Sequence, residues 1–327
     1  MTFVSRREGG PEPENSLTAV ETATFPYETA ASFRTALKDR FGAIAKGDDR
    51  YTVAELQRQF AYDRALARLF TAVDADRWVL KGAGALLARL ERARHSKDID
   101  LYYAEESAAS QEAVSALWDA LSRDIGDHFQ FDVVKIVSLQ EEAKGSRVHV
   151  QARLGPKSYA GFHIDVVVGT AMSGEPDAVA PLTPLQIVGL VRPPYRAFPL
   201  ADHVADKFCA IITSHYGVAA VNASSRIKDL VDIALIAQTQ ELSGSGLHAA
   251  IVAGLAHRKL VAPEAFAIPD EPSWRKGYPA SAADAPAPVP SFDEACELAA
   301  SLLDPILHGT VTGTWNPTTA SWQPVHS

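Results

Sequence analysis

One stretch, WVLKGAGALLARLERARHSKDIDLYY at positions 78–103, constrains the fold more than any other part of the chain. An apolar run typical of a short buried strand is followed by a turn of small residues and then by a helix-like segment. A second apolar strand closes the stretch, and Asp98 and Asp100 interrupt it with only Ile99 between them. A strand, a turn, a helix and a strand in this order predict an α/β arrangement.

The two aspartates need a reason to lie so close together. Alternate residues of a strand point to the same face, so Asp98 and Asp100 are expected on one face while Ile99 points into the core. Two carboxylates about 4 Å apart repel by roughly 4 kcal/mol at an effective dielectric constant of 20. A divalent cation offsets this best, and oxygen ligands favour Mg²⁺ or Mn²⁺. The alternative is that one aspartate caps a turn and the other is solvated.

The rest of the chain predicts an α/β (α+β) fold, in which a mixed-sheet domain is followed by a helical domain. Residues 1–25 are expected to be a flexible tail, residues 26–192 the first domain with its N-terminal helices, and residues 193–327 the helical domain. Proline and alanine predict a long loop at 268–290, and the last twenty or so residues are expected to pass from ordered to frayed. Helical spacing covers 28–73, 107–124, 201–216, 225–240, 246–258 and 291–307, and strands are expected at 128–139, 147–154 and 161–169.

Composition limits the classes of function. A net charge of −9 argues against a nucleic-acid binder that works by bulk electrostatics, although basic residues gather locally. These groups are Lys81, Arg89, Arg92, Arg94 and Lys97; Arg192, Arg196 and Lys207; and Arg226 with Lys228. Two cysteines, no apolar run long enough to span a bilayer and no secretory signal favour the cytoplasm and no membrane partner.

Two further features connect the aspartates to phosphate chemistry. Gly82, Ala83 and Gly84 lie between a strand and a helix, where small residues let backbone N–H groups approach a phosphate. Asp165 interrupts the apolar strand FHIDVVVG, and a metal held by Asp98 and Asp100 would give this carboxylate a partner. This is the layout of a nucleotidyltransferase site, with a nucleoside triphosphate (NTP) at the turn and carboxylates around two metal ions.

The sequence resembles the DNA polymerase beta-like nucleotidyltransferases, whose signature is a glycine-rich turn followed after 9–13 residues by Asp-x-Asp. Within that superfamily it is similar to the AbiEii-type toxins, which include the mycobacterial MenT toxins. The matching positions are Trp78, Leu80, Lys81, Gly82, Ala85, Leu86, Arg89, Ser96, Asp98, Ile99, Asp100 and Leu101. A later lysine motif is matched by Lys207, and a last motif by Arg226, Lys228, Asp229, Leu230, Asp232 and Ile233.

The resemblance implies an enzyme that transfers a nucleoside monophosphate (NMP) from an NTP to RNA, at the 3′ end of tRNA, as the toxin of a toxin–antitoxin pair. A cognate antitoxin protein is therefore an expected partner. The implied catalytic residues are Asp98, Asp100, Asp165, Lys207 and Asp229, with Mg²⁺ or Mn²⁺ on Asp98, Asp100 and Asp165. The implied nucleotide-binding residues are Lys81, Gly82, Ala83, Gly84, Ser96 and Lys207.

Several alternatives stay open at this stage. The acceptor could be a small molecule such as an antibiotic, or a protein hydroxyl. Ala83 replaces a family glycine and tolerates a positive φ poorly, which predicts weaker nucleotide binding and leaves room for an inactive binding module. Lys207 could be a surface lysine, and Arg226–Asp229 and Lys228–Asp232 could be surface ion pairs. Because they lack ligand spacing, four histidines are expected to be structural: His95, His149, His163 and His203.

Overall fold

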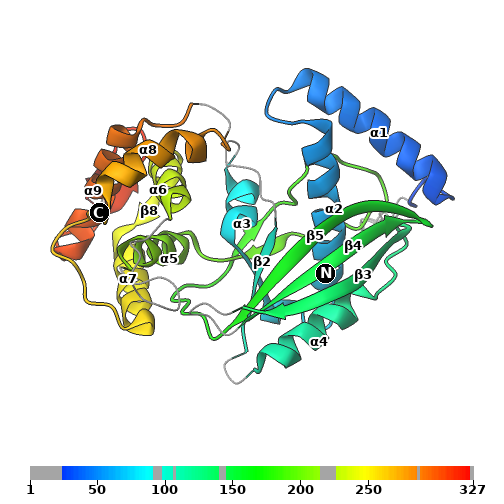
Figure 1. The fold of residues 1–327 in the computed structure, drawn as a ribbon, viewed down its shortest axis with the longest axis horizontal. Helices are drawn as coiled ribbons and strands as arrows, with labels where there is room; N and C mark the ends of the chain where they lie inside the picture. The colour runs from blue at the N-terminus through cyan, green and yellow to red at the C-terminus, as the bar shows by residue number, and fades with distance from the viewer. Residues whose placement is uncertain are drawn as a thin grey trace, which may run out of the picture.

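The computed structural model describes residues 24–90, 98–105, 108–139, 145–213, 226–285 and 288–324, and its elements are labelled in Figure 1. The helices are α1 (Ala30–Gly47), α2 (Val53–Leu69), α3 (Gly82–Arg89), α4 (Ser110–Leu121), α5 (Leu200–Ile212), α6 (Ile227–Thr239), α7 (Gly244–Arg258), α8 (Glu271–Ala282) and α9 (Phe292–Leu307). The strands are β1 (Trp78–Lys81), β2 (Ile99–Tyr103), β3 (Phe129–Ser138), β4 (Gly145–Leu154), β5 (Lys157–Val168), β6 (Asp177–Val179), β7 (Tyr195–Ala197), β8 (Leu242–Ser243), β9 (Thr314–Asn316) and β10 (Ser321–Gln323).

A mixed seven-stranded sheet, in the order β3-β4-β5-β2-β1-β7-β6, organises the first half of the chain. β2 runs parallel to β5 and β1 parallel to β7, whereas the other neighbours are antiparallel. Alternation along GSRVHVQARL buries every second residue of β4 in the core and leaves the residues between them on the other face. Helices α2 and α4 contact β5 on the core side, so the opposite face of these strands is available for polar residues.

The helices that precede the sheet begin where the sequence provides caps. The predicted helical stretch 28–73 is two helices, and the polar segment between them separates α1 from α2. Thr29 caps α1, and Thr52 forms a capping box with Glu55 at the start of α2. The predicted helix and strand positions elsewhere are confirmed to within a few residues, apart from the two segments described below.

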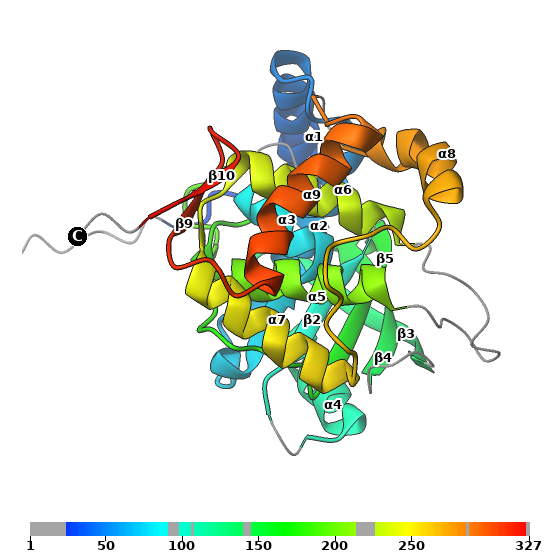
Figure 2. The same ribbon diagram turned by 90° about the vertical axis from the view of Figure 1, so that its left-hand side faces the viewer.

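A second apolar core lies among α5, α6, α7, α8 and α9. Figure 2 shows these helices in front of the sheet and α3 lying between them and the strands. Leu86 of α3 and Leu90 just beyond the helix belong to this second core, while Ala85 of α3 belongs to the core of the sheet. Helix α3 therefore joins the two parts of the molecule. No helix among the described residues is both long and apolar enough to cross a bilayer.

Two segments of the second half are more ordered than the sequence predicted. The loop expected at 268–290 contains α8, which is capped by Asp270 and buries Trp274 and Tyr278 one turn apart. The tail, expected to pass from ordered to frayed, contains β9 and β10; β9 pairs with both β8 and β10, and Trp315 is buried. In both cases a few large aromatic side chains outweigh a composition rich in proline, alanine and threonine, because each buries a large apolar area.

The strand β7 lies beyond residue 192 but belongs to the seven-stranded sheet, where it pairs with β1 and β6. Asp63 of α2 binds β7 and the segment that precedes it. Its carboxylate accepts hydrogen bonds from the backbone N–H groups of Leu182 and Thr183 and from the Tyr195 hydroxyl at 2.7 Å. The segment that follows the Pro-Pro pair is therefore held against β1, next to the small-residue turn.

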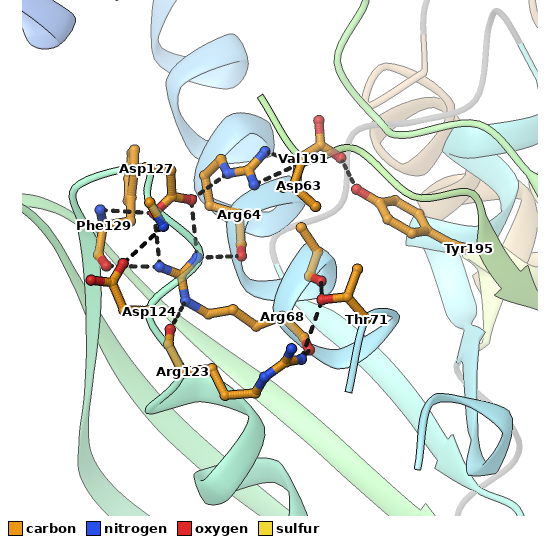
Figure 3. A network of polar contacts seen from close by, with 12 residues as sticks. Asp63, Arg64, Arg68, Thr71, Arg123, Asp124, Asp127, Phe129, Val191 and Tyr195 are labelled. Carbon is orange, nitrogen blue, oxygen red and sulfur yellow. Dashed lines mark hydrogen bonds and ion pairs between the residues drawn. The ribbon is translucent and has the colours of Figure 1, made fainter. Parts of the chain in front are cut away.

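Figure 3 shows a buried network in which Asp127 joins two arginines of α2. Arg64 donates to Asp127 at 2.7 Å and Arg68 at 2.8 Å, and none of the three residues is more than 1% exposed. Burial disfavours the charged carboxylate, but the two guanidinium groups hold the pKa of Asp127 below its usual range. The network ties α2 to the segment that leads from α4 into β3.

We expect Asp127→Asn to lower the free energy of unfolding by roughly 3–5 kcal/mol, because it leaves two buried positive charges without an anion. Urea denaturation at neutral pH measures this. A matched control is Asp132→Asn, which breaks a pair with Arg153 whose side chains are 43% and 41% exposed, and should cost less than about 1 kcal/mol. Equal losses in the two variants would contradict the role given to the network.

Candidate active site

Four adjacent strands place charged residues in one row across the sheet. Lys81 of β1 pairs with Asp100 of β2, Asp100 with Asp165 of β5, and Asp165 with Arg147 of β4. Directly paired residues point to the same face of a sheet, so two carboxylates lie side by side with a cation at each end of the row. Arg147 donates to both oxygens of Asp165, at 2.8 and 2.7 Å.

A second row lies two residues earlier on β2 and β5. Asp98, just before β2, lies beside His163 of β5, with 3.2 Å between the Asp98 Oδ2 and His163 Nε2 atoms. One ligand atom from each of Asp98, His163 and Asp165 lies within 4.8 Å of the others. Two carboxylates and an imidazole are donors that a divalent cation binds, so these residues fit the expected metal. The structure thus brings Asp98, Asp100 and Asp165 to one patch of the sheet.

The turn between β1 and α3 is shaped by the Asp100 carboxylate. Gly82 has a φ of +60°, and a Cβ atom built on it would lie 1.7 Å from Asp100 Oδ2. Only glycine combines this backbone conformation with such a close approach. Ala83 and Gly84 are inside α3, and Ala83 does not have a positive φ. The expectation that Ala83 distorts the turn was therefore wrong, since only position 82 requires glycine, and the inactive-module alternative loses its support.

Lys207 of α5 is buried between two aspartates of α6. Its Nζ atom donates to Asp229 Oδ1 at 2.8 Å and to Asp232 Oδ2 at 2.6 Å, and only 7% of its side chain is exposed. The surface-lysine alternative is thereby excluded. The expected Lys228–Asp232 pair was also wrong, because Lys228 binds Asp284 instead and Asp232 faces the core. Arg226 does approach Asp229, at 3.9 Å.

A pocket of about 500 Å³ lies between the sheet and the helical part of the chain. From the sheet side it is lined by Lys81, the Gly82 turn, Asp100 and Asp165, and from the helical side by residues of α5, α6 and α7. The helical residues include Asp202, His203, Asp206, Lys207, Arg226, Asp229, Arg258 and Lys259. Asp206 holds two of the pocket cations, since it lies 2.8 Å from Arg258 and 3.9 Å from Lys81.

Comparison with known proteins identifies the family. The model of the family described as nucleotidyl transferase AbiEii toxin, type IV toxin–antitoxin system, matches residues 64–298, which is more than half of the chain. The chain belongs to the AbiEii nucleotidyltransferase toxin family. No curated protein matches it at a significant level.

One solved structure shares the fold of this AbiEii-family chain. MenT4, a nucleotidyltransferase toxin from Mycobacterium tuberculosis, is similar with a TM-score of 0.54 and 16% identity over 83% of this chain and 89% of that chain. JHP933 from Helicobacter pylori matches with a TM-score of 0.36 and 14% identity over 63% of this chain and 80% of that chain. The mixed α/β fold with its helical second half is thus that of a nucleotidyltransferase toxin.

Sequence reasoning missed two residues of the AbiEii-family site. His163 was expected to be structural, but it lies beside Asp98 and Asp165. Arg147 was not considered, but it binds Asp165. His163 precedes Asp165 by two residues and therefore shares its face of β5, a signal that was present in FHIDVVV. Arg147 could not be found in this way, because the pairing of β4 with β5 is needed to place it.

Two arginines of the predicted basic groups form hydrogen bonds with other residues of the chain. Arg89 donates to Asp177 and to the Phe198 carbonyl, and Arg192 donates to the carbonyls of Thr183 and Leu185. These two arginines are therefore not available to guide a substrate. Ser96, together with Arg92, Arg94 and Lys97 of the first basic group, lies outside the described residues.

Asp100 has an unusual protonation equilibrium. Its removal from water raises its pKa to about 7, and the negative charges of Asp98 and Asp165 act in the same direction. Without metal, folded Asp100 holds a proton that an unfolded aspartate, with an ordinary pKa of 3.8, releases. Its contribution to stability is therefore full below pH about 4 and is lost as the pH rises through about 7.

We expect Asp100→Asn to raise the melting temperature of the metal-free protein at pH 8 and to have little effect at pH 4. The amide is neutral at both values, whereas the carboxylate is charged only at the higher one. Thermal melts in the presence of a chelator measure the difference. A variant that is no more stable than wild type at pH 8 would show that the charge of Asp100 is already compensated in the free protein.

Proposed function

We propose that this AbiEii-family nucleotidyltransferase transfers an NMP from an NTP to a hydroxyl group of RNA, with the 3′ end of tRNA as the acceptor. The observation that carries the proposal is the pocket in which Lys81, the Gly82 turn and Lys207 face Asp100 and Asp165. Cations and a helix N-terminus suit the triphosphate, and neighbouring carboxylates suit a divalent cation. Both requirements of the reaction meet in one cavity.

The roles of the residues follow from their positions. Lys81, Lys207 and the backbone at Gly82–Gly84 bind the phosphates, and Asp229 holds Lys207 in place. Asp98, Asp100 and Asp165 would hold the Mg²⁺ or Mn²⁺ ions of the reaction, which would neutralise phosphate charge. The acceptor oxygen attacks the α-phosphorus, the bond from the α-phosphorus to the bridging oxygen breaks, and pyrophosphate leaves. The hydroxyl proton passes to a carboxylate of the cluster.

An RNA acceptor is supported by the charge at the rim of the pocket. Arg226 at the start of α6 and Lys259 at the end of α7 are exposed there, and the half-buried Arg258 also lines the pocket. A local basic rim lets an acidic protein bind a phosphate backbone. A cationic antibiotic would favour acidic groups at the same place. Within a type IV toxin–antitoxin system, modification of the tRNA 3′ end would block aminoacylation in the cytoplasm, and an antitoxin protein would relieve it.

Incubation of the protein with total tRNA, Mg²⁺ or Mn²⁺ and each α-labelled NTP tests the proposal. The wild-type protein should transfer label to RNA from an α-labelled NTP but not from a γ-labelled NTP. Asp165→Asn should be inactive while keeping its fold. Label from γ-labelled NTP would indicate phosphate transfer instead. Label in protein, or in an added aminoglycoside, would replace RNA by another acceptor. No incorporation in any fraction would overturn the proposal.

A further inference from the structure

We propose that His163 is a direct ligand of one divalent cation, which makes Asp98, His163 and Asp165 the protein ligands of that ion and gives the site a preference for Mn²⁺ over Mg²⁺. The inference rests on the proposed function only in that a divalent cation binds this patch of the sheet. It adds a nitrogen ligand to a site for which the sequence predicted carboxylates alone.

The distances support a shared ion. The His163 Nε2 atom is 3.2 Å from Asp98 Oδ2, and ligand atoms of all three residues lie within 4.8 Å of one another. Ligands held at about 2.1 Å in an octahedron lie about 3 Å apart when adjacent and about 4.2 Å apart when opposite. Small side-chain rotations therefore close the three residues around one ion. The side chains of His163 and Asp98 are 25% and 32% exposed, so an ion from solvent can reach them.

The backbone places the imidazole where a ligand is needed. His163 and Asp165 share one face of β5, and Ile164 between them is only 1% exposed and anchors the strand in the core. Asp100, in contrast, directs its Oδ2 atom at Gly82, on the side of the phosphate pocket. His163 therefore lies beside Asp98 and Asp165, while Asp100 lies toward the phosphate pocket.

The charge around the site favours a transition metal. Arg147 donates to both oxygens of Asp165 and so neutralises part of the negative charge on which Mg²⁺ binding depends. A carboxylate has enough lone pairs to accept these hydrogen bonds and still bind an ion, so Arg147 acts as an orienting partner of Asp165. With one imidazole, two carboxylates and an adjacent cation, the site is less anionic and softer than a three-carboxylate site. Such a donor set suits Mn²⁺ better than Mg²⁺.

The test is pulsed electron paramagnetic resonance of the full-length protein with Mn²⁺ alone, because a coordinated imidazole gives a ¹⁴N coupling to the ion. We expect this coupling in wild type, its loss in His163→Gln, and its retention in His149→Gln. His149 is the matched control, since it pairs with His163 directly across β4 and β5 with 5.9 Å between the ring centroids. Circular dichroism confirms that each variant is folded.

A titration gives a second readout. His163→Gln should weaken Mn²⁺ binding by about tenfold or more and change Mg²⁺ binding, measured by competition, much less. Mn²⁺ bound without ¹⁴N coupling, coupling that persists in His163→Gln, or no Mn²⁺ binding by wild type would each overturn the inference. These measurements need no nucleotide and no RNA. If the protein transfers NMP but shows no ¹⁴N coupling, only the role of His163 as a metal ligand is refuted. If it shows the coupling but transfers no NMP, only the proposed function is refuted.

Discussion

Gly82→Ala will reduce nucleotidyl transfer by at least about a hundredfold while leaving the protein folded, because misplacement of a reacting group by about 1 Å costs this much. The added methyl group would lie 1.7 Å from Asp100 Oδ2, and residue 82 has a φ of +60° that alanine adopts only with strain. The Asp100 carboxylate must move, and the turn that faces the phosphates must move with it. Transfer of label from an α-labelled NTP to RNA measures the loss.

Gly84→Ala is the matched control for this prediction. Gly84 lies in the same turn of α3, has no positive φ, and a Cβ there would meet only Leu80 Cδ1 at an ordinary 3.5 Å. We expect this variant to keep activity close to that of wild type, because alanine fits there without moving the backbone that faces the phosphates, and alanine should stabilise the helix slightly. If both variants lose activity to the same extent, the loss is a general effect of adding a methyl group to α3. It would then not depend on the contact between residue 82 and Asp100.

Lys207→Met should have two separable effects. Removal of the ammonium takes away a cation that lines the pocket and partly opposes the rise in the pKa of Asp100, so activity should fall by about 10²–10³-fold. It also leaves Asp229 and Asp232 without their shared partner in a buried place, which should lower the free energy of unfolding by about 3–5 kcal/mol. Urea denaturation and the RNA-labelling assay measure the two effects.

The double variant Lys207→Met with Asp232→Asn distinguishes catalysis from stability. Asp232 is 1% exposed and faces the core, so neutralising it removes much of the electrostatic cost without adding a cation to the pocket. We expect most of the lost stability to return while activity stays low. Recovery of activity together with stability would show that Lys207 acts only as a structural partner of the aspartates.

Local patterns in the sequence were enough for much of the fold. The strand at Trp78–Lys81, the helix that follows and the strand with Asp98 and Asp100 are confirmed, because hydrophobic periodicity and glycine reflect interactions between residues close in sequence. The same patterns failed at α8 and at the β9–β10 hairpin. There, burial of Trp274 and Trp315 against distant helices outweighs the local preference for loop.

The sequence by itself singled out the residues proposed to carry the chemistry of a nucleotidyltransferase: an Asp-x-Asp strand, a glycine turn, one later aspartate and a lysine on a helix. Only the tertiary structure decided what surrounds them. The parallel register of β2 with β5 sets Asp165 beside Asp100, and the antiparallel pairing of β5 with β4 adds Arg147. The packing of α5 on α6 converts Lys207 from a candidate surface residue into a buried one. Strand pairing and helix packing depend on contacts between residues far apart in the chain, and no local pattern encodes them.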